Sequence, residues 1–270
     1  MITINYTGNF GNTMFQYCFA RLHAETNKFN LGTNLPPGVV KTTPHLTVTE
    51  PSKKGRIVIN DTDYHNFRQK HGSHIMKLDP EYDYTFNGYF QDADLLNSHR
   101  SIVLKFFELP KQEKNTTDTL VLFRLGDFIH DGWNSEIIHY DWYNEAIKMM
   151  PGEKKFVISS NRIEVGPSTK EHEQKYIDRL YNPSKQYEIP KGGDHDFNYI
   201  LTFDNIISSN STWSWWACYL SDASNIITHE WFGHFTPKIK KSHGIHMNNL
   251  KYIKYASRSI DGDFINILEI

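Results

Sequence analysis

Short apolar segments that suit β-strands alternate with longer amphipathic segments that suit α-helices along almost the whole chain. "MITINY" and "TLVLFRLGDF" have strand character, whereas the apolar residues after "TGNFGN" recur at helical spacing from Asn12 to Ala24. Where strands and helices alternate in this way, each helix carries the chain back to the start of the next strand, so the strands lie parallel. The sequence therefore predicts an α/β fold with parallel sheets.

The remaining segments extend this pattern into two halves. "PKQEKNTTD" combines a proline with charged and small polar residues, which is typical of a linker. We therefore expect two sheet domains, residues 1–115 and 116–235, followed by a C-terminal tail at 236–270 that could pack back on the first domain. Further strands are expected at "GRIVIN", "YTFNGYF", "KKFVISSN", "NIISSN" and, as the last strand, "NIITHEWF"; further helices are expected at "QDADLLNSHRSIVLKFFEL", "DWYNEAIKMMPG", "DFNYILTFD" and "STWSWWACYLSD".

Composition and charge exclude several classes of protein. Hydrophobic residues make up 39% of the chain and charged residues 22%, which suits a globular protein and not a disordered one. The net charge of −2 offers no excess of positive charge for nucleic-acid phosphates, so we expect no nucleic-acid partner. Cys18 and Cys218 each lie in an apolar helical pattern, which predicts two buried thiols in a reducing compartment and no disulfide.

No segment has the features of a membrane span or of a secretory signal. The apolar runs fall short of the roughly 18 residues that a transmembrane helix needs. No basic region followed by an apolar one opens the chain. We expect a cytoplasmic protein without a transmembrane segment, and a peripheral association with a membrane stays open.

"FRLGDF" places Arg124 at the end of a predicted strand and Asp127 just after the turn at Gly126. Ligands of open α/β sheets bind beyond the carboxyl ends of the strands. A guanidinium group there is a forked donor that suits phosphate oxygens. The alternative is an Arg–Asp ion pair that only closes the loop, and this segment alone leaves both open.

Five polar residues fill the turn between the predicted strand "NIIS" and the helix that follows it. One such residue is enough to cap a helix. The positive N-terminus of a helix, with its unbonded backbone N–H groups, also attracts anions. The candidates for binding an anion here are Ser209, Asn210, Ser211 and Thr212, and the alternative is a helix with surplus caps. The opening loop "TGNFGN" stands between a strand and a helix in the same way, but it matches neither GxGxxG nor a P-loop.

Paired acids and paired histidines are the possible metal ligands. Asp-x-Asp pairs hold Mn²⁺ or Mg²⁺ in many metal-dependent sugar transferases. None of the triplets here follows a clear buried strand, so we expect solvated acids; the histidine pairs lack a full ligand set, so we expect surface or loop histidines and no metal site. The triplets are Asp61/Asp63, Asp92/Asp94 and Asp261/Asp263, and the histidine pairs are His71/His74 and His243/His246.

"GNFGNTMFQYCFAR" resembles the "GxLGNQxFQYAFAR" opening of the bacterial-type α-1,2-fucosyltransferases of glycosyltransferase family 11. The order and rough spacing of the similar segments follow that family from residue 5 to residue 235 or so. The other similar segments are "GYFQDADLL" beside the family's "GYWQSEKYF", "FRLGDF" beside the core of "HVRRGDY", "FVISSNRIEV" beside "FFSDDIEW", and "NIISSNSTWSWWACYL" beside "NIISNSTFSWWxAxL". The last of these is long and specific. The others are moderately specific alone and strong in combination.

The resemblance implies a GT-B architecture, in which two Rossmann-like domains face each other across a cleft, with residues 1–115 as the acceptor-side domain and residues 116–235 as the domain that binds the nucleotide sugar. It implies a glycosyltransferase that moves L-fucose with inversion from GDP-β-L-fucose to a hydroxyl of a glycan acceptor, typically O2 of galactose. No metal or other cofactor is implied, because the GDP-sugar is a co-substrate. Arg124 would neutralise the β-phosphate as the glycosidic bond breaks. Asp127 is the second implied catalytic residue, and the choice of base stays open between it, Glu25, Asp92 and Asp94.

The resemblance also implies which residues bind the donor, and the chain departs from the family at several of its motifs. The family histidine is Leu122 here, its second arginine is Leu125, its paired carboxylates are Asn161 and Arg162, and its tryptophan is Val165. These changes leave two alternatives open: a transferase of the same fold with another sugar nucleotide, and a catalytically inactive module that binds nucleotide sugars or glycans. The implied donor-binding residues are Gly11, Asn12, Gln16, Ser160, Asn161, Ser209, Asn210, Ser211 and Thr212.

Overall fold

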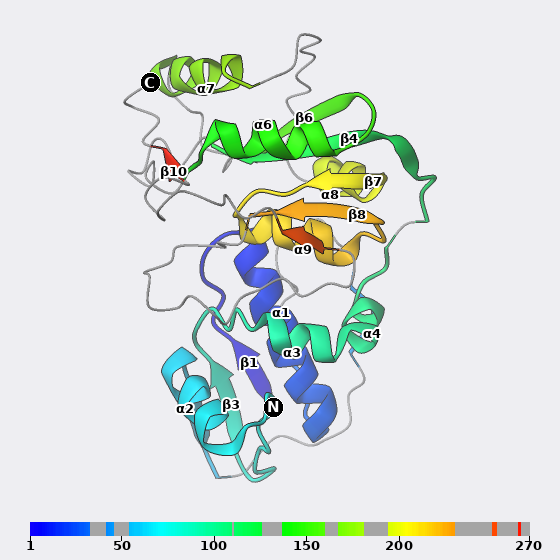
Figure 1. The fold of residues 1–270 in the computed structure, drawn as a ribbon. Coiled ribbons are helices and arrows are strands. Elements are labelled where there is room, and N and C mark those ends of the chain that lie inside the picture. The colour runs from blue at the N-terminus through cyan, green and yellow to red at the C-terminus, as the bar shows by residue number, and fades with distance from the viewer. Residues whose placement is uncertain are drawn as a thin grey trace. The chain divides into compact units, whose positions relative to one another are not determined.

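The computed structural model describes residues 1–32, 42–45, 54–109, 111–125, 137–159, 167–180, 194–229, 250–252 and 264–265. The chain divides into two compact units, which part between Pro110 and Lys111. Each unit is built on a parallel sheet with helices packed against it (Figure 1), as the alternation in the sequence predicts.

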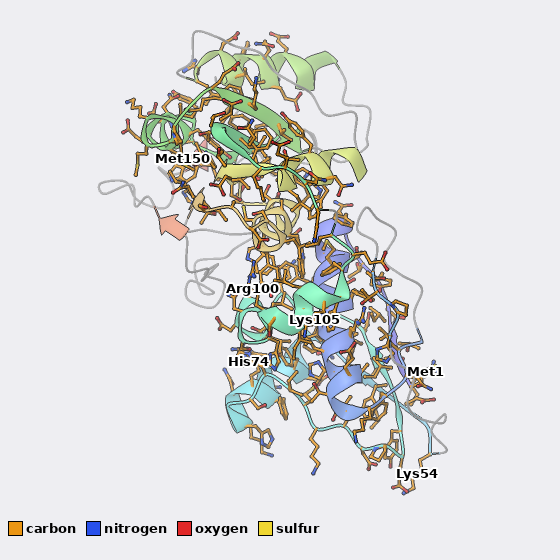
Figure 2. The ribbon with its side chains drawn as sticks, turned by 90° about the vertical axis from the view of Figure 1, so that its right-hand side faces the viewer. Met1, Lys54, His74, Arg100, Lys105 and Met150 are labelled. Atoms are coloured by element: carbon orange, nitrogen blue, oxygen red, sulfur yellow. The ribbon has the colours of Figure 1, made fainter. Side chains whose placement is uncertain are left out.

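The first unit holds a three-stranded parallel sheet in the order β1-β3-β2. Met1 and Lys54, labelled in Figure 2, precede β1 and β2 and mark the amino edge of this sheet. The carboxyl edge is formed by the loops that follow the three strands. The elements of this unit are β1 (Ile2–Ile4), α1 (Phe10–Asn27), β2 (Arg56–Ile59), α2 (Asp61–His71), β3 (Asp83–Phe86), α3 (Ala93–Ser98), α4 (Arg100–Val103) and the 3-10 helix η1 (Leu104–Phe106).

Two predictions for the first unit were wrong in extent. The segment predicted as one helix from "QDADLL" to "FFEL" is divided into α3, α4 and η1, because His99 leaves the helical conformation with φ −116° and ψ 20°. The strand predicted over "YTFNGYF" ends at Phe86, and Phe90 has a left-handed φ of 46°. The Asp61 carboxylate accepts hydrogen bonds from the backbone N–H groups of Tyr89 and Phe90. The conformation of this segment therefore depends on a residue 28 or more positions away in the sequence.

Helix α1 is the centre of the first unit's core. Thirteen of its residues are buried, so the helix is covered on almost all sides, as expected for an interior helix. The Phe19 ring stacks on Phe90 with centroids 4.2 Å apart and meets Tyr64 and Phe86 edge to face. Part of the chain's high aromatic content is thus explained by core packing.

Arg21 is buried on α1 and connects three parts of the first unit. Its Nη1 donates to the Tyr17 hydroxyl and to the carbonyls of Thr43 and Phe106, at 2.8, 2.8 and 3.4 Å. Its Nη2 donates to the Pro44 carbonyl and the Thr43 hydroxyl. Its Nε donates to Glu25 at 2.9 Å. The five donors of one guanidinium therefore hold residues 42–45 and η1 against α1.

His23, two residues after Arg21 on α1, is fully buried. Its Nε2 accepts the backbone N–H of Met76, so the proton lies on Nδ1, which donates to the Phe19 carbonyl at 2.8 Å. Burial lowers the pKa of His23 from 6.5 to about 4, although the bond to Phe19 acts in the opposite direction.

We expect the free energy of unfolding of the first unit to fall as the pH drops from 6.5 towards 4. In this window the unfolded chain binds a proton at His23 that the folded chain cannot, so the contribution of His23 is complete above pH 6.5 and is lost as the pH approaches the folded pKa. Urea unfolding followed by circular dichroism should show an uptake of about one proton between these values. The plot of unfolding free energy against pH should be flatter in this window for His23→Gln than for the wild type. An equal slope in the variant would contradict the assignment of this proton to His23.

The second unit holds a five-stranded parallel sheet in the order β6-β4-β7-β8-β9 and a separate antiparallel pair of β5 and β10. Figure 1 draws α6 on one face of the sheet and α8 and α9 on the other. The elements are β4 (Asn115–Arg124), β5 (Ile137–Ile138), α6 (Tyr140–Met149), β6 (Lys154–Ser159), α7 (Pro167–Asp178), α8 (Asp194–Leu201), β7 (Phe203–Ile207), α9 (Thr212–Leu220), β8 (Asn225–Thr228), β9 (Leu250–Tyr252) and β10 (Phe264–Ile265).

The second unit extends beyond its predicted elements at several places. β4 begins at Asn115, inside the predicted linker, because Asn115 pairs with Phe203 of β7. "NIITHEWF" is not the last strand, because β9 and β10 come from the predicted C-terminal tail and β9 pairs with β8. Helix α7 was not predicted; its sequence is mostly polar, and among the residues whose burial is described only Tyr176 and Ile177 are buried in it. Tertiary pairing therefore recruits segments with weak local patterns.

Alternate residues of β4 face the core that α6 covers. Val121, Phe123 and Leu125 belong to one buried cluster with Trp142 and Tyr143 of α6. Tyr143 also donates its hydroxyl to the Leu122 carbonyl at 3.0 Å. The strand's two-residue period therefore directs Leu122 and Arg124 to the opposite face of the sheet.

Both cysteines are buried and reduced, as their apolar surroundings in the sequence predict. Cys18 lies in α1 and Cys218 in α9, and burial raises the pKa of each thiol, to about 12 for Cys218. Across the part of the chain that the structure describes, no helix is both long and apolar enough to span a bilayer.

Candidate functional site

The carboxyl edge of the second sheet brings together two of the segments that the sequence singled out. β4 ends at Arg124, which is paired with Ser159 at the end of β6. On its other side β4 runs parallel to β7, with Val121 opposite Ile207. Beyond that pair β4 ends at Arg124 and the chain after β7 enters the turn at 208–212, so the two lie at the carboxyl ends of neighbouring strands. A basic side chain and a helix N-terminus thus lie at neighbouring strand ends, where open α/β sheets bind ligands.

Arg124 carries the positive charge of β4. It is half-buried at the strand end, and no other residue of the strand is basic. Leu122 and Leu125, which stand where the similar family has a histidine and a second arginine, are both buried in the core. A basic side chain at Leu125 would have to point into the apolar cluster below α6. Arg124 is therefore the basic side chain that β4 itself brings to this edge.

The serines after β7 form a closed group of hydrogen bonds. Ser211 is the N-cap of α9, and its Oγ accepts the backbone N–H of Ser214 at 3.1 Å. The hydroxyls of Ser209, Ser211 and Ser214 lie 2.6 to 3.3 Å from one another. All three side chains are buried. Each hydroxyl has one proton to donate, so a ring of three uses all of them internally.

This group changes what the turn can offer to a ligand. The serine hydroxyls are engaged with one another, whereas the N–H groups of Thr212 and Trp213 come too early in α9 to have an intrahelical partner. Thr212 is half-buried and Asn210 is buried. The turn is therefore suited to binding an anion through backbone amides and the helix dipole, with the serines holding the turn in shape.

We expect Ser211→Ala to keep the fold and to weaken donor binding. The change removes the cap on Ser214 and opens the ring, at a cost of about 1 kcal/mol in unfolding free energy. Because the ring shapes the amides of the turn, the KM for the donor should rise severalfold. Ser224→Ala, which removes the bond from the exposed Ser224 hydroxyl to Asp204 at the other end of the sheet, is the matched control. An unchanged KM with a clear loss of stability would make the turn a cap only.

His229 is a polar residue at this edge that the sequence reading missed. It follows β8 directly, and the pairing of Ile227 with Ile207 places it next to Ser209 in register. Its ring is 4% exposed and meets Trp142 edge to face with centroids 5.4 Å apart. The sequence feature that could have revealed it is a histidine just after the apolar run of "NIITHEWF". The predicted strand was drawn through this histidine, so it was not considered as a site residue.

The opening loop of the first unit is held by two side-chain amides. Gln16 is fully buried; its Nε2 donates to the carbonyls of Thr7 and Gly88 at 3.1 and 2.9 Å, and its Oε1 accepts the Thr7 N–H. Asn12 accepts a bond from Gln91 at 2.9 Å. Gln16 thus fastens the loop to the segment after β3, and any part it has in binding a donor would be indirect.

The glycines of this loop have a steric reason. Gly8 has a φ of 78°, and a Cβ there would collide with the Asn12 side chain. Gly11 is buried in the first turn of α1. Gly8 therefore has a structural role: its backbone passes close to Asn12 in a left-handed conformation, which glycine adopts without strain.

Asp92 is not a solvated acid, contrary to the prediction. It is 4% exposed, and it accepts hydrogen bonds from the Tyr64 hydroxyl at 2.6 Å, from the Leu95 N–H and from His74 Nδ1 at 3.0 Å. Arg68 lies 2.9 Å away. Burial raises the pKa of Asp92, but these bonds and the charge of Arg68 outweigh it and hold the pKa below its ordinary 3.8. The carboxylate ties α2 to the start of α3.

His74 is also more involved than a surface histidine. The residue, labelled in Figure 2, comes from the loop after α2, and its side chain is 28% exposed beside Asp92. His71, in contrast, is exposed and packs on the ring of Phe67. The sequence could not separate them, because the partner of His74 lies 18 residues away.

The first acid triplet has structural partners too. Asp63 and Asn60 form a capping box at the start of α2. The Asp61 carboxylate accepts two backbone N–H groups. Over the described ranges, no cluster of three or more His, Cys, Asp or Glu side chains could hold a metal ion.

Three of the four candidate bases are in ion pairs. Glu25 lies 2.9 Å from Arg21, and Asp92 and Asp94 lie 2.9 and 3.6 Å from Arg68.

The fourth candidate base, Asp127, lies outside the described residues, as do several other predicted positions. These are Ser160, Asn161, Arg162 and Val165, together with the pairs Asp261/Asp263 and His243/His246.

Comparison with known proteins gives one informative similarity, and no family model matches the chain. The chain is 24% identical over 185 residues to the O-antigen biosynthesis glycosyltransferase WbnK of Escherichia coli. The similar part covers 58% of this chain and 58% of that relative, less than two thirds of its length. The mixed α/β fold with parallel sheets fits a Rossmann-like glycosyltransferase, and the similarity supports this class of enzyme.

Proposed function

We propose that the chain is an inverting glycosyltransferase that transfers L-fucose from GDP-β-L-fucose to a hydroxyl of a glycan acceptor, typically O2 of galactose. The observation that carries this proposal is the juxtaposition of Arg124 and the N-terminus of α9 at neighbouring strand ends of one parallel sheet. The similarity to a glycosyltransferase of O-antigen biosynthesis supports the class of reaction.

The proposed chemistry needs charge neutralisation at the leaving group. As the bond between the sugar and the β-phosphate breaks, negative charge gathers on the diphosphate and positive charge on the sugar. The Arg124 fork would bind two phosphate oxygens, and the first amides of α9 would bind others. Because these donors are in place before the reaction, they stabilise the developing charge without reorganising. The acceptor oxygen attacks the anomeric carbon from the opposite side, and Asp127 is our candidate for taking its proton.

A transferase that uses another sugar nucleotide is the second candidate. The observation that favours it is the burial of Leu122 and Leu125, which leaves β4 with one basic group at its end. The single basic group at the end of β4 would also suit a catalytically inactive module that binds nucleotide sugars or glycans.

A panel of sugar nucleotides tests these candidates. Each is mixed with the chain in turn, and the melting temperature and the release of nucleotide are measured with and without acceptor. A ligand that binds only the native state raises stability by RT ln(1 + [L]/Kd), so the true donor stands out. We expect GDP-β-L-fucose to give the largest shift. A larger shift with another sugar nucleotide would favour the second candidate, and a shift without turnover would favour the binding module.

We expect the activity to survive EDTA, because Arg124 and the helix N-terminus supply the positive charge that a metal would otherwise provide. The initial rate of transfer with excess EDTA should stay within about twofold of the untreated rate. Removal of a catalytic metal would instead cost several kcal/mol of transition-state stabilisation and lower the rate far more. Loss of turnover with EDTA and its recovery with Mn²⁺ or Mg²⁺ would contradict the mechanism.

A further inference from the structure

We propose that the carboxyl edge of the first sheet binds an uncharged sugar ring, with Tyr89 as the surface on which the ring stacks and Asn9 and Asn87 as partners for its hydroxyls. This inference rests on the proposed function and adds the acceptor side to it. The family resemblance implies that the first domain faces the acceptor and that Gly11 and Asn12 contact the donor, but it gives no role to Tyr89, Asn9 or Asn87.

Two of the three loops at this edge are fastened to each other by side chains. Residues 5–12 follow β1 and residues 87–91 follow β3, which is β1's neighbour in the sheet. One nitrogen, Nε2 of Gln16, donates to a carbonyl in each segment, and Gln91 donates to Asn12. The two loops therefore form one preformed surface, which lowers the cost of ordering when a ligand binds.

Tyr89 is exposed on a backbone that is unusually well fixed. Its side chain is one of the large exposed apolar groups of the described chain, with 45% of the residue exposed. Yet its N–H and that of Phe90 are both bound by the Asp61 carboxylate at 2.8 Å. Phe90 adopts a left-handed φ of 46° while its ring stacks in the core. Strained backbone often lies at binding sites, and here the strained residue directly follows the exposed Tyr89.

The polar groups on this surface are amides. Asn5, Asn9 and Asn87 are exposed. Asn9 is the N-cap residue of α1, yet its side chain makes no capping hydrogen bond, so the amide is not used for the function that favours asparagine at this position. An amide offers both a donor and an acceptor, which matches the paired hydroxyls of a pyranose.

The charge of the edge favours a neutral ligand over the donor nucleotide. Residues 5–12 and 87–91 contain no Lys, Arg, Asp, Glu or His, and the charged group bonded to them, the exposed Asp61 after β2, is negative. A diphosphate would gain little there, because phosphate recognition relies on positive charge. An aromatic face flanked by amides instead suits a sugar, whose apolar face can cover the ring while its hydroxyls bond at the rim.

Ligand-observed saturation-transfer NMR on the full chain tests this assignment. Lactose is the neutral probe, because it ends in a β-galactose, and GDP is the nucleotide probe. We expect lactose to bind the wild type, and its Kd to rise by about tenfold or more in Tyr89→Ala as the apolar contact is lost. Tyr89→Phe, which keeps the ring, should bind like the wild type. Tyr82→Ala is the matched control, because Tyr82 directly precedes β3 at the opposite edge of the same sheet.

The binding of GDP separates this inference from the proposed function. GDP should bind wild type and Tyr89→Ala equally and should be weakened by Arg124→Ala. Absence of lactose binding in the wild type, equal lactose binding in Tyr89→Ala, or loss of GDP binding in Tyr89→Ala would each overturn the inference. Failure of GDP or GDP-β-L-fucose to bind the wild type would instead overturn the proposed donor, and the lactose comparison would still decide the role of Tyr89.

Discussion

Replacing Arg124 by Ala is expected to lower kcat by about a hundredfold or more, in line with the roughly 2.7–4 kcal/mol lost when one preorganised donor to a developing charge is removed. Arg124 is the one basic residue of β4, and Leu125 beside it is buried in the core. No second guanidinium on this strand can therefore take over. Arg124→Lys should recover little of the rate, because an ammonium group cannot form the planar bidentate contact.

Three measurements separate this role from a structural one. Single-turnover rate, donor KM and melting temperature are compared for Arg124→Ala, for Asp127→Ala and for the control Arg179→Ala, which removes an exposed arginine of the same unit. The mechanism expects a large loss of rate in Arg124→Ala with a melting temperature close to that of the wild type. If Arg124 and Asp127 formed only a structural pair, both variants would melt earlier and the surviving folded protein would keep a near-normal rate. Near wild-type turnover in Arg124→Ala would sink the mechanism.

The largest effect on stability is expected from Arg21→Met, which should lower the free energy of unfolding of the first unit by about 3–5 kcal/mol. The methionine fills much of the same space but leaves the carbonyls of Thr43, Pro44 and Phe106 and the Tyr17 hydroxyl without their donor. Tyr17 and Phe106 are buried, so their oxygens would retain the full cost of desolvation, whereas Pro44 is exposed and its carbonyl can bond to water. Arg21→Lys should recover only part of the loss, because one ammonium cannot reach all of these groups.

The distribution of tryptophan makes this test specific. All six tryptophans follow residue 110, so their fluorescence reports on the second unit, whereas far-ultraviolet circular dichroism reports on both. In Arg21→Met we expect a circular-dichroism transition at lower urea and an unchanged tryptophan transition. Glu25→Gln is the control, because Glu25 is 29% exposed and its ion pair should contribute about 1 kcal/mol or less. Unchanged unfolding in Arg21→Met would show that residues 42–45 and η1 do not depend on this side chain.

The elements that could be predicted are those with a strong local pattern. α1, α6 and α9 carry clear helical spacing, and β1, β2, β6 and β7 are short apolar runs, so their existence followed from the order of residues. The same holds for the burial of both cysteines and for Arg124 at a strand end. α7 and β9 were missed, because the first is mostly polar and the second is a three-residue strand stabilised by pairing with β8.

The sequence by itself determined the alternation of strands and helices, the position of Arg124 at a strand end and the capped start of α9, because each depends on residues close together in the chain. The pairing of β4 with β7, which brings Arg124 and α9 to the same edge, was decided by the tertiary structure. Only the tertiary structure decided which polar side chains are left for chemistry. Gln16 and Asp92 looked like candidates for donor binding and for catalysis, but their partners Gly88, Tyr64 and Arg68 lie 24 to 72 residues away and engage them inside the first unit. Tyr89, which no motif singled out for binding, stays exposed because the Asp61 carboxylate fixes its backbone. The physical reason is that a buried polar group must find a partner, and which partner it finds depends on the fold, not on its neighbours in sequence.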